Sequence, residues 1–167
     1  MKEIYTEIEI NASAGIVWSI LADFDDFLRW NPFIRKISGK LQEGAQIEVC
    51  ITPPKNYRFF GQAKTNGFCK PPNSNGMKFR PKILVYDPER ELRWLGNFWI
   101  PKLFDGEHSL VIKEISENKV LFIQKERFSG LFVPFLSGTL KDTESGFEMM
   151  NHALKEEAEN KYNKQTD

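Results

Sequence analysis

The fold is decided by residues 139–162, which read TLKDTESGFEMMNHALKEEAENKY. Apolar or small residues recur every three or four positions and form one stripe along a helix: Leu140, Thr143, Phe147, Met150, Leu154 and Ala158. The pattern predicts a long amphipathic helix from about Thr139 to Tyr162, with residues 163–167 as a frayed tail. Gly146 inside it costs about 1 kcal/mol relative to Ala, which favours a spatial reason such as close approach of a sheet or a ligand.

The chain before this helix consists mainly of short segments typical of β-strands, separated by turn residues. The predicted strands are Glu3–Ile10, Phe33–Gly39, Ala45–Thr52, Met77–Tyr86, Glu91–Trp99, His108–Ser116 and Lys119–Phe128. Two short helices separate the first two strands: one is capped by Ser13, and the other ends at Asn31 because Pro32 follows. The order of hairpins predicts an α+β protein in which an antiparallel sheet of about seven strands is covered by the long helix.

Length and composition describe one globular domain over residues 1–167, with 41% hydrophobic and 28% charged residues. The 23 basic residues balance the 23 acidic ones, which argues against nucleic acid as a partner. No apolar run approaches the roughly 20 residues that span a bilayer, so we expect no membrane insertion. Since the start of the sequence does not resemble a signal peptide, we expect a cytoplasmic protein in which Cys50 and Cys69 are reduced thiols.

Several kinds of catalytic signature are missing from the sequence. It has no glycine-rich phosphate loop, no dinucleotide fingerprint and no nucleophile elbow. With two histidines and no Cys-x-x-Cys motif, it supports neither a zinc site nor a histidine-based triad. We therefore expect no metal and no cofactor.

The best polar candidates are His108 and Glu126, each near the end of a predicted strand. A histidine near a carboxylate can act as a general acid or base, or the two can orient a ligand. The structural alternative is a satisfied strand-end histidine and a glutamate paired to a neighbouring arginine. Asn151, one position beyond Met150 on the helix, either reaches the edge of a cavity or is partly exposed.

Seven stretches, in their order along the chain, resemble a known superfamily: Ala14–Trp18, Trp30–Ile34, Phe79–Ile83, Pro88–Gly96, Phe104–His108, Glu126–Gly130 and Gly146–Asn151. They resemble the START-like, helix-grip proteins (SRPBCC domains), and within them the polyketide cyclase/dehydrase and lipid-transport branch. The resemblance implies a curved sheet wrapped around the C-terminal helix, with a hydrophobic small molecule held between them. The chain departs from that pattern by an insertion at about residues 54–76.

Aromatic residues make up 13% of the chain, and each of them is more often core than ligand contact. The resemblance selects a set of candidate pocket residues: Trp30, Phe33, Trp94, Trp99, Phe104, His108, Glu126, Phe128, Phe132, Phe147, Met150 and Asn151. We rank binding or transport of a lipid, polyketide-like or aromatic ligand first. A cofactor-independent cyclase or dehydratase using His108 and Glu126 is one alternative, and protein interaction through the 54–76 insertion is another. A homodimer is left open.

Overall fold

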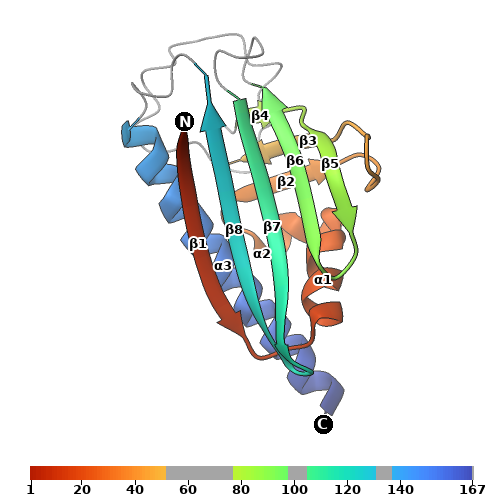
Figure 1. The fold of residues 1–167 in the computed structure, drawn as a ribbon. Coiled ribbons are helices and arrows are strands. Elements are labelled where there is room, and N and C mark those ends of the chain that lie inside the picture. The colour runs from red at the N-terminus through yellow and green to blue at the C-terminus, as the bar shows by residue number, and fades with distance from the viewer. Residues whose placement is uncertain (52–76, 98–104, 131–136, 167) are drawn as a thin grey trace.

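The computed structural model describes residues 1–51, 77–97, 105–130 and 137–166. Its elements, in chain order, are β1 (Lys2–Ile10), α1 (Ala14–Ala22), a 3-10 turn (Phe24–Asp26), α2 (Phe27–Trp30), β2 (Ile34–Ser38), β3 (Glu48–Ile51), β4 (Met77–Phe79), β5 (Lys82–Asp87), β6 (Glu91–Asn97), β7 (Asp105–Ser116), β8 (Lys119–Ser129) and α3 (Ser137–Thr166). The predicted α+β class and the order of its elements are confirmed, with two short helical segments between β1 and β2 (Figure 1).

The strands of the described residues form two antiparallel sheets, whereas the sequence predicted one sheet of about seven strands. Five strands follow the order β1-β8-β7-β6-β5 and three follow the order β2-β3-β4. The predicted strand Met77–Tyr86 is two strands, because Pro81 lacks the N–H group that would continue the ladder. The Pro81 carbonyl instead accepts a hydrogen bond from the Ile47 backbone N–H at 2.9 Å, and this contact joins the two sheets.

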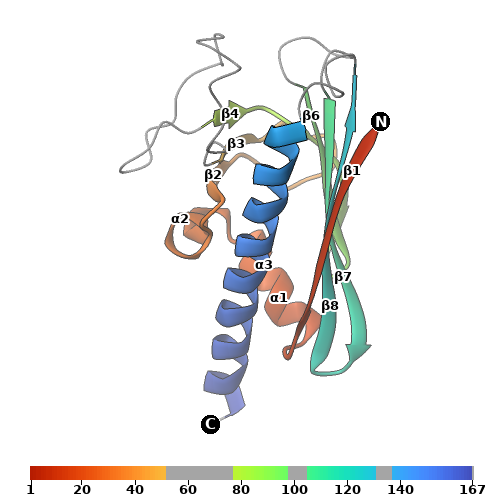
Figure 2. The same cartoon turned by 90° about the vertical axis from the view of Figure 1, so that its left-hand side faces the viewer.

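Helix α3 crosses one face of the five-stranded sheet, which we call the inner face (Figure 2). The three-stranded sheet and α2 lie on the other side of α3, so that the upper half of the helix is gripped between the two sheets. The predicted helical stripe is confirmed, since Leu140, Phe147, Met150, Leu154 and Ala158 are all buried. This arrangement is the architecture that the sequence analysis predicted for the C-terminal helix.

The last turns of α3 are helical up to Thr166, beyond the predicted end at Tyr162. The expected frayed tail is therefore wrong for residues 163–166. The preceding turns are tied to the start of the chain: Lys155 Nζ donates to the Glu9 carbonyl at 2.8 Å and Lys161 Nζ to Ser19 Oγ at 2.8 Å. These contacts hold the helix against β1 and α1 close to its end.

Some sequence predictions fall outside the described residues or need correction. The 54–76 insertion, Trp99, Phe104 and Phe132 lie outside them. The expectation of a reduced thiol is wrong for Cys50, which is disulfide-bonded. Within the described ranges, no helix is both long and apolar enough to cross a membrane.

Close packing explains the glycine at position 146, as the sequence predicted. The group that approaches it is the side chain of Phe33, and neither the sheet nor a ligand. A Cβ atom at this position would overlap the ring of Phe33, whose Cε2 atom would lie 2.6 Å away. Phe33 comes from the segment before β2, and its ring packs edge-on against Phe147 with centroids 5.6 Å apart. The missing side chain thus lets the segment before β2 pack directly on α3.

We predict that Gly146→Ala destabilises the protein by about 1–3 kcal/mol, because the added methyl group displaces the buried Phe33 ring. The matched control is Gly15→Ala in α1, where the new Cβ would meet the flexible carboxyl of Glu89 at 3.4 Å. That change is expected to be neutral or stabilising by up to about 1 kcal/mol. Urea unfolding of both variants makes the comparison, and equal stabilities would contradict the packing argument.

Candidate ligand-binding site

One row of side chains runs across the inner face from strand to strand. The strand registers place Ile83 beside Trp94, Trp94 beside His108, His108 beside Glu126, and Glu126 beside Ile4. Directly paired residues of antiparallel strands point to the same face of a sheet. The two polar residues selected from the sequence therefore lie next to each other in an otherwise apolar row.

His108 is packed between aromatic rings. Its imidazole stacks on Phe147 of α3, with centroids 4.7 Å apart and planes 6° from parallel, and meets Trp94 edge-on at 4.9 Å. Its Nε2 atom lies 3.1 Å from Gln124 Oε1. The side chain is 5% exposed, so His108 is a core residue as much as a site residue.

The hydrogen bonds of Gln124 determine which nitrogen of His108 carries the proton. Gln124 Nε2 donates to Asn151 Oδ1 at 2.6 Å and to the Phe147 carbonyl at 3.3 Å, which uses both of its N–H groups. Its Oε1 is then the acceptor, so His108 donates from Nε2 and leaves Nδ1 unprotonated. Asn151 Nδ2 completes the chain by donating to Thr6 Oγ1 at 3.1 Å. This network connects β7, β8, α3 and β1.

Burial lowers the pKa of His108 to about 4, with the hydrogen bond to Gln124 opposing the shift. The cause is desolvation, because a charged imidazolium among aromatic rings loses its hydration. At neutral pH the imidazole is therefore neutral, a hydrogen-bond donor at Nε2 and a base at Nδ1.

Glu126 lies beside His108 in this row, on the neighbouring strand β8. Its carboxyl covers Gly106, since a Cβ at that glycine would lie 2.5 Å from Glu126 Oε1. Gly106 pairs with Gly96 across β6 and β7, so two neighbouring positions of the inner face carry no side chain. A Cβ at Gly96 would meet, among described atoms, Pro81 Cβ at 3.8 Å and the Gly106 carbonyl at 3.9 Å. The Glu126 and Phe128 side chains thus fill the space over Gly106, whereas a Cβ at Gly96 would meet no described atom closer than 3.8 Å.

The Glu126 carboxyl makes no hydrogen bond or ion pair with any described residue. Part of the side chain remains accessible to solvent, yet the surrounding atoms are dense enough that burial raises its pKa to about 8. Desolvation is the one cause of the shift, so no nearby charge holds the carboxylate. Glu126 is therefore a protonated, uncharged acid at neutral pH.

The contacts of His108 and Glu126 can be compared with the two interpretations made from the sequence, a functional pair and two structurally satisfied residues. His108 is satisfied by Gln124, as in the structural alternative, but Glu126 is not paired to an arginine in the described part of the chain. The two residues are cross-strand neighbours without a hydrogen bond between them. They are thus a separate neutral base and neutral acid.

The other predicted residues fall into two groups. Phe33, Trp94, Phe128, Phe147, Met150 and Asn151 are all buried, and Phe33 and Asn151 reach the same cluster through Phe147 and Gln124. Trp30 lies apart from the row, because α2 is on the side of α3 away from the five-stranded sheet (Figure 2). Its ring packs on Phe27 with centroids 5.1 Å apart.

Three features of the site were missed from the sequence: Gln124, Thr6 and the Gly96–Gly106 pair. A signal for the first two is visible in hindsight. Gln124 lies between Phe122 and Glu126 on its strand face, and Thr6 lies between Ile4 and Ile8 on its own. Polar residues at such positions need internal partners, but periodicity alone does not identify them.

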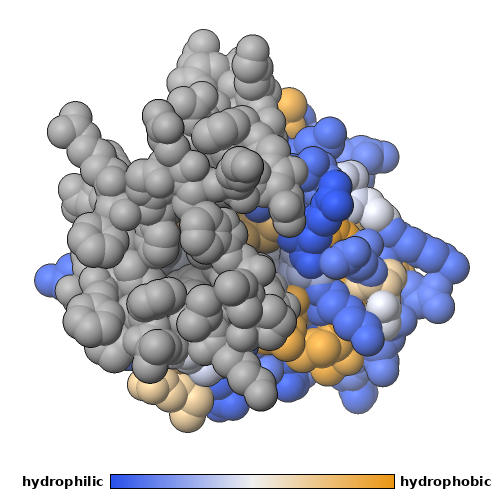
Figure 3. Space-filling model, turned by 90° about the horizontal axis from the view of Figure 1, so that it is seen from above, coloured by the Kyte–Doolittle hydropathy of each residue, from blue (hydrophilic) through white to orange (hydrophobic). Residues whose placement is uncertain are grey.

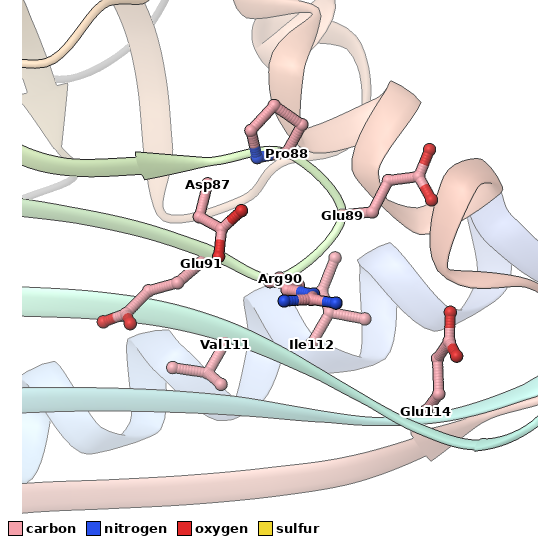
Figure 4. Close-up of a pocket in the computed structure, with 8 residues that line it drawn as sticks. All are labelled: Asp87, Pro88, Glu89, Arg90, Glu91, Val111, Ile112 and Glu114. Atoms are coloured by element: carbon pink, nitrogen blue, oxygen red, sulfur yellow. The ribbon is translucent and has the colours of Figure 1, made fainter.

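A separate groove of about 600 Å³ lies at the turn between β5 and β6 (Figure 4). Charged side chains line most of it: Asp87, Glu89, Arg90, Glu91 and Glu114. None of the predicted site residues belongs to it, and its charged lining does not suit an apolar ligand. No group of three or more metal-ligating side chains was found in the described ranges.

Seen from above, the visible described surface is mainly hydrophilic, with hydrophobic residues in a few places beside the grey atoms (Figure 3). This is the end of the molecule at which β6 and β8 finish and α3 begins (Figure 1). The glycine pair lies one row closer to this end than the row of Trp94, His108 and Glu126.

A family model described as polyketide cyclase / dehydrase and lipid transport matches residues 1–159. The chain belongs to this family. The resemblance stated from the sequence is confirmed, and no curated protein matches. The matched span covers nearly the whole chain.

Solved structures show the same fold at low sequence identity. The Zhui aromatase/cyclase of Streptomyces sp. R1128 is 11% identical, with a TM-score of 0.66 over 95% of this chain and 93% of that one. A START superfamily protein of Mycobacterium smegmatis is 17% identical, with a TM-score of 0.63 over 95% and 97%. The di-domain ARO/CYC protein BexL is 14% identical, with a TM-score of 0.66. The similarity covers 95% of this chain and 47% of the BexL chain.

For this family member we predict that Glu126 makes unfolding stability fall as pH rises from about 6.5 to about 8, because below about 6.5 the lowered pKa of His108 contributes the opposite slope. In that window the folded state keeps a proton on Glu126 that the unfolded chain has lost, so a higher pH favours unfolding. Glu126→Gln removes this titration and is expected to flatten the fall. Urea unfolding across the window measures it, with Glu107→Gln on the outer face as the control. Parallel curves for wild type and Glu126→Gln would contradict the raised pKa.

Proposed function

We propose that the protein binds a hydrophobic small molecule on the inner face, between the five-stranded sheet and the upper part of α3. The observation that carries this proposal is Gly96, where a Cβ would meet no described atom closer than 3.8 Å, together with the nearby Glu126 carboxyl, which bonds to no described residue. A sheet face that packed only against its own helix would fill such a position with a side chain. We infer that this part of the inner face leaves space for another molecule.

The surroundings of the glycine pair have the composition of a small-molecule site. Phe128 is in the same row as Gly106, and Trp94 precedes Gly96 by two residues on the same face. Such sites are mostly apolar and aromatic, with a few polar groups that orient the ligand. Here the polar groups are the uncharged Glu126 and, next to it, His108.

The comparisons support the same class of function. The matching family is described by cyclase, dehydrase and lipid-transport activities, and two of the similar structures are titled aromatase/cyclases. Binding an apolar molecule is the requirement that these activities share. We therefore infer binding or transport of a lipid, polyketide-like or aromatic compound as the function.

Filling the glycine pair tests the proposal. We predict that Gly96→Leu weakens binding of 2-ethylnaphthalene at least about tenfold, since its side chain occupies the proposed ligand space. Because a Cβ at Gly96 meets described atoms only at 3.8 Å or more, the variant is expected to fold. The control, Leu95→Phe, adds bulk to the outer face of the same strand. Native mass spectrometry and titration of tryptophan fluorescence measure the binding.

Equal affinities for wild type, Gly96→Leu and Leu95→Phe would mean that the probe binds elsewhere. Absence of any added mass in the wild-type protein after incubation with such probes and with a total lipid and metabolite extract would contradict the proposed function.

A second candidate function is a cofactor-independent dehydratase or cyclase. The observation that favours it is a neutral acid beside a neutral base, with pKa values of about 8 and about 4. Environments that push two titratable groups apart are typical of acid–base sites. In a dehydration, His108 Nδ1 would take a proton from carbon while Glu126 protonates the departing hydroxyl, which leaves as water. Return of the proton from the imidazolium to the carboxylate would restore both groups.

If the protein is such an enzyme, its rate should be constant between about pH 4 and about pH 8 and fall on either side. Below this range His108 becomes protonated, and above it Glu126 loses its proton. Glu126→Gln is expected to abolish turnover while leaving ligand binding intact. An unchanged pH–rate profile in His108→Ala, or full turnover in Glu126→Gln, would exclude this mechanism.

A further inference from the structure

The inner face contains one acid whose hydrogen-bonding capacity is unused. Gln124, Asn151, Thr6 and His108 all bond to one another or to backbone, whereas Glu126 bonds to no described residue. The backbone groups of β7 and β8 are engaged in the sheet ladder on both sides of it. A carboxyl group in such a position needs an explanation.

We propose that Glu126 is the polar anchor of the ligand and selects uncharged molecules that carry a carbonyl or hydroxyl oxygen, against carboxylates. The inference rests on the proposed function and names the ligand class of that site. The carboxyl lies over Gly106, and Gly106 pairs with Gly96, where a Cβ would meet no described atom closer than 3.8 Å. From there its O–H group can donate to a ligand oxygen, and its carbonyl oxygen can accept from a ligand hydroxyl.

The charges around the site argue against an anionic ligand. The buried polar residues of the described chain are Thr6, Asn31, His108, Ser109, Gln124, Thr143 and Asn151, and none of them is a lysine or arginine. Lys2, on the same face of β1 as Ile4, is exposed to solvent. No buried lysine or arginine of the described chain would pair with a ligand carboxylate placed against Glu126, and an unpaired buried charge is costly. An uncharged carbonyl or hydroxyl group has no such cost.

The selection depends on the protonation of Glu126. The strand register places His108 of β7 and Ile4 of β1 beside Glu126, with Lys2 and Thr6 on the same face of β1, and Phe147 of α3 stacks on His108. Lys2 is exposed. With its pKa lowered to about 4, the buried His108 stays neutral above that pH. Above about pH 8, Glu126 loses the proton that it donates. Affinity for a carbonyl ligand should then fall, by up to about tenfold per pH unit.

Three probes of equal ring size test the anchor: 2-acetylnaphthalene, 2-ethylnaphthalene and 2-naphthoate. Wild-type protein at about pH 6 should bind the acetyl compound about tenfold more tightly than the ethyl compound, as one hydrogen bond allows, and the naphthoate most weakly. At about pH 9.5 the preference for the acetyl compound should disappear. Titration of tryptophan fluorescence measures each affinity.

Variants separate the hydrogen bond from packing. Glu126→Gln keeps an N–H donor without titration, so it should retain the acetyl preference at both pH values. Glu126→Leu has no donor and should bind the acetyl and ethyl compounds equally at both. Glu107→Gln, on the outer face, should behave as wild type. Unfolding curves establish that each variant is folded before binding is compared.

Two results would overturn the proposal in distinguishable ways. If wild type binds 2-ethylnaphthalene but shows no acetyl preference, or if Glu126→Leu keeps that preference, Glu126 is not the anchor and the proposed function stands. If wild type binds neither the three probes nor any component of the total lipid and metabolite extract, the proposed function fails and the anchor fails with it.

Discussion

The hydrogen bonds of the Gln124 side-chain amide join elements that are far apart in the sequence. On one side the amide accepts from His108 on β7, and on the other it donates to Asn151 and the Phe147 carbonyl on α3. A buried amide is stable only when its donors and acceptor are all satisfied. The network therefore fixes how far α3 lies along the sheet, and with it the position of Phe147 against His108 and Phe33.

This register divides the inner face into two regions with different roles. Around Gln124 the amide groups, Thr6 and His108 Nε2 are hydrogen-bonded and the aromatic rings are in contact, so the region is filled by the protein itself. Beside it lie Glu126, which has no partner among the described residues, and the Gly96–Gly106 pair nearer the end of β6. The first region holds the helix in place, and the second is the region that we assign to the ligand.

Sequence periodicity predicted the helix, the strand order and the buried stripe because these depend on local spacing. It also selected Phe147, Asn151, His108 and Glu126. It failed where a residue far away in the chain decides the outcome. Gly146 is explained by Phe33, more than a hundred positions earlier, and the break at Pro81 became visible only once Ile47 was placed beside it. Gln124 and Thr6 were missed for the same reason, since their partner Asn151 lies on another element.

The chemistry of His108 and Glu126 also depends on position within the inner face and not on residue type. In water the imidazole would titrate above the carboxyl, but burial reverses the order, with pKa values of about 4 and about 8. His108 is kept neutral by rings on both sides and has its Nε2 proton committed to Gln124. Glu126 keeps a proton that no described residue accepts.

An acid held neutral at the edge of an apolar space can bind an uncharged oxygen without introducing a charge, and the same property would let it protonate a leaving group. Binding and catalysis thus use one feature of the site, and turnover by Glu126→Gln is the measurement that separates them.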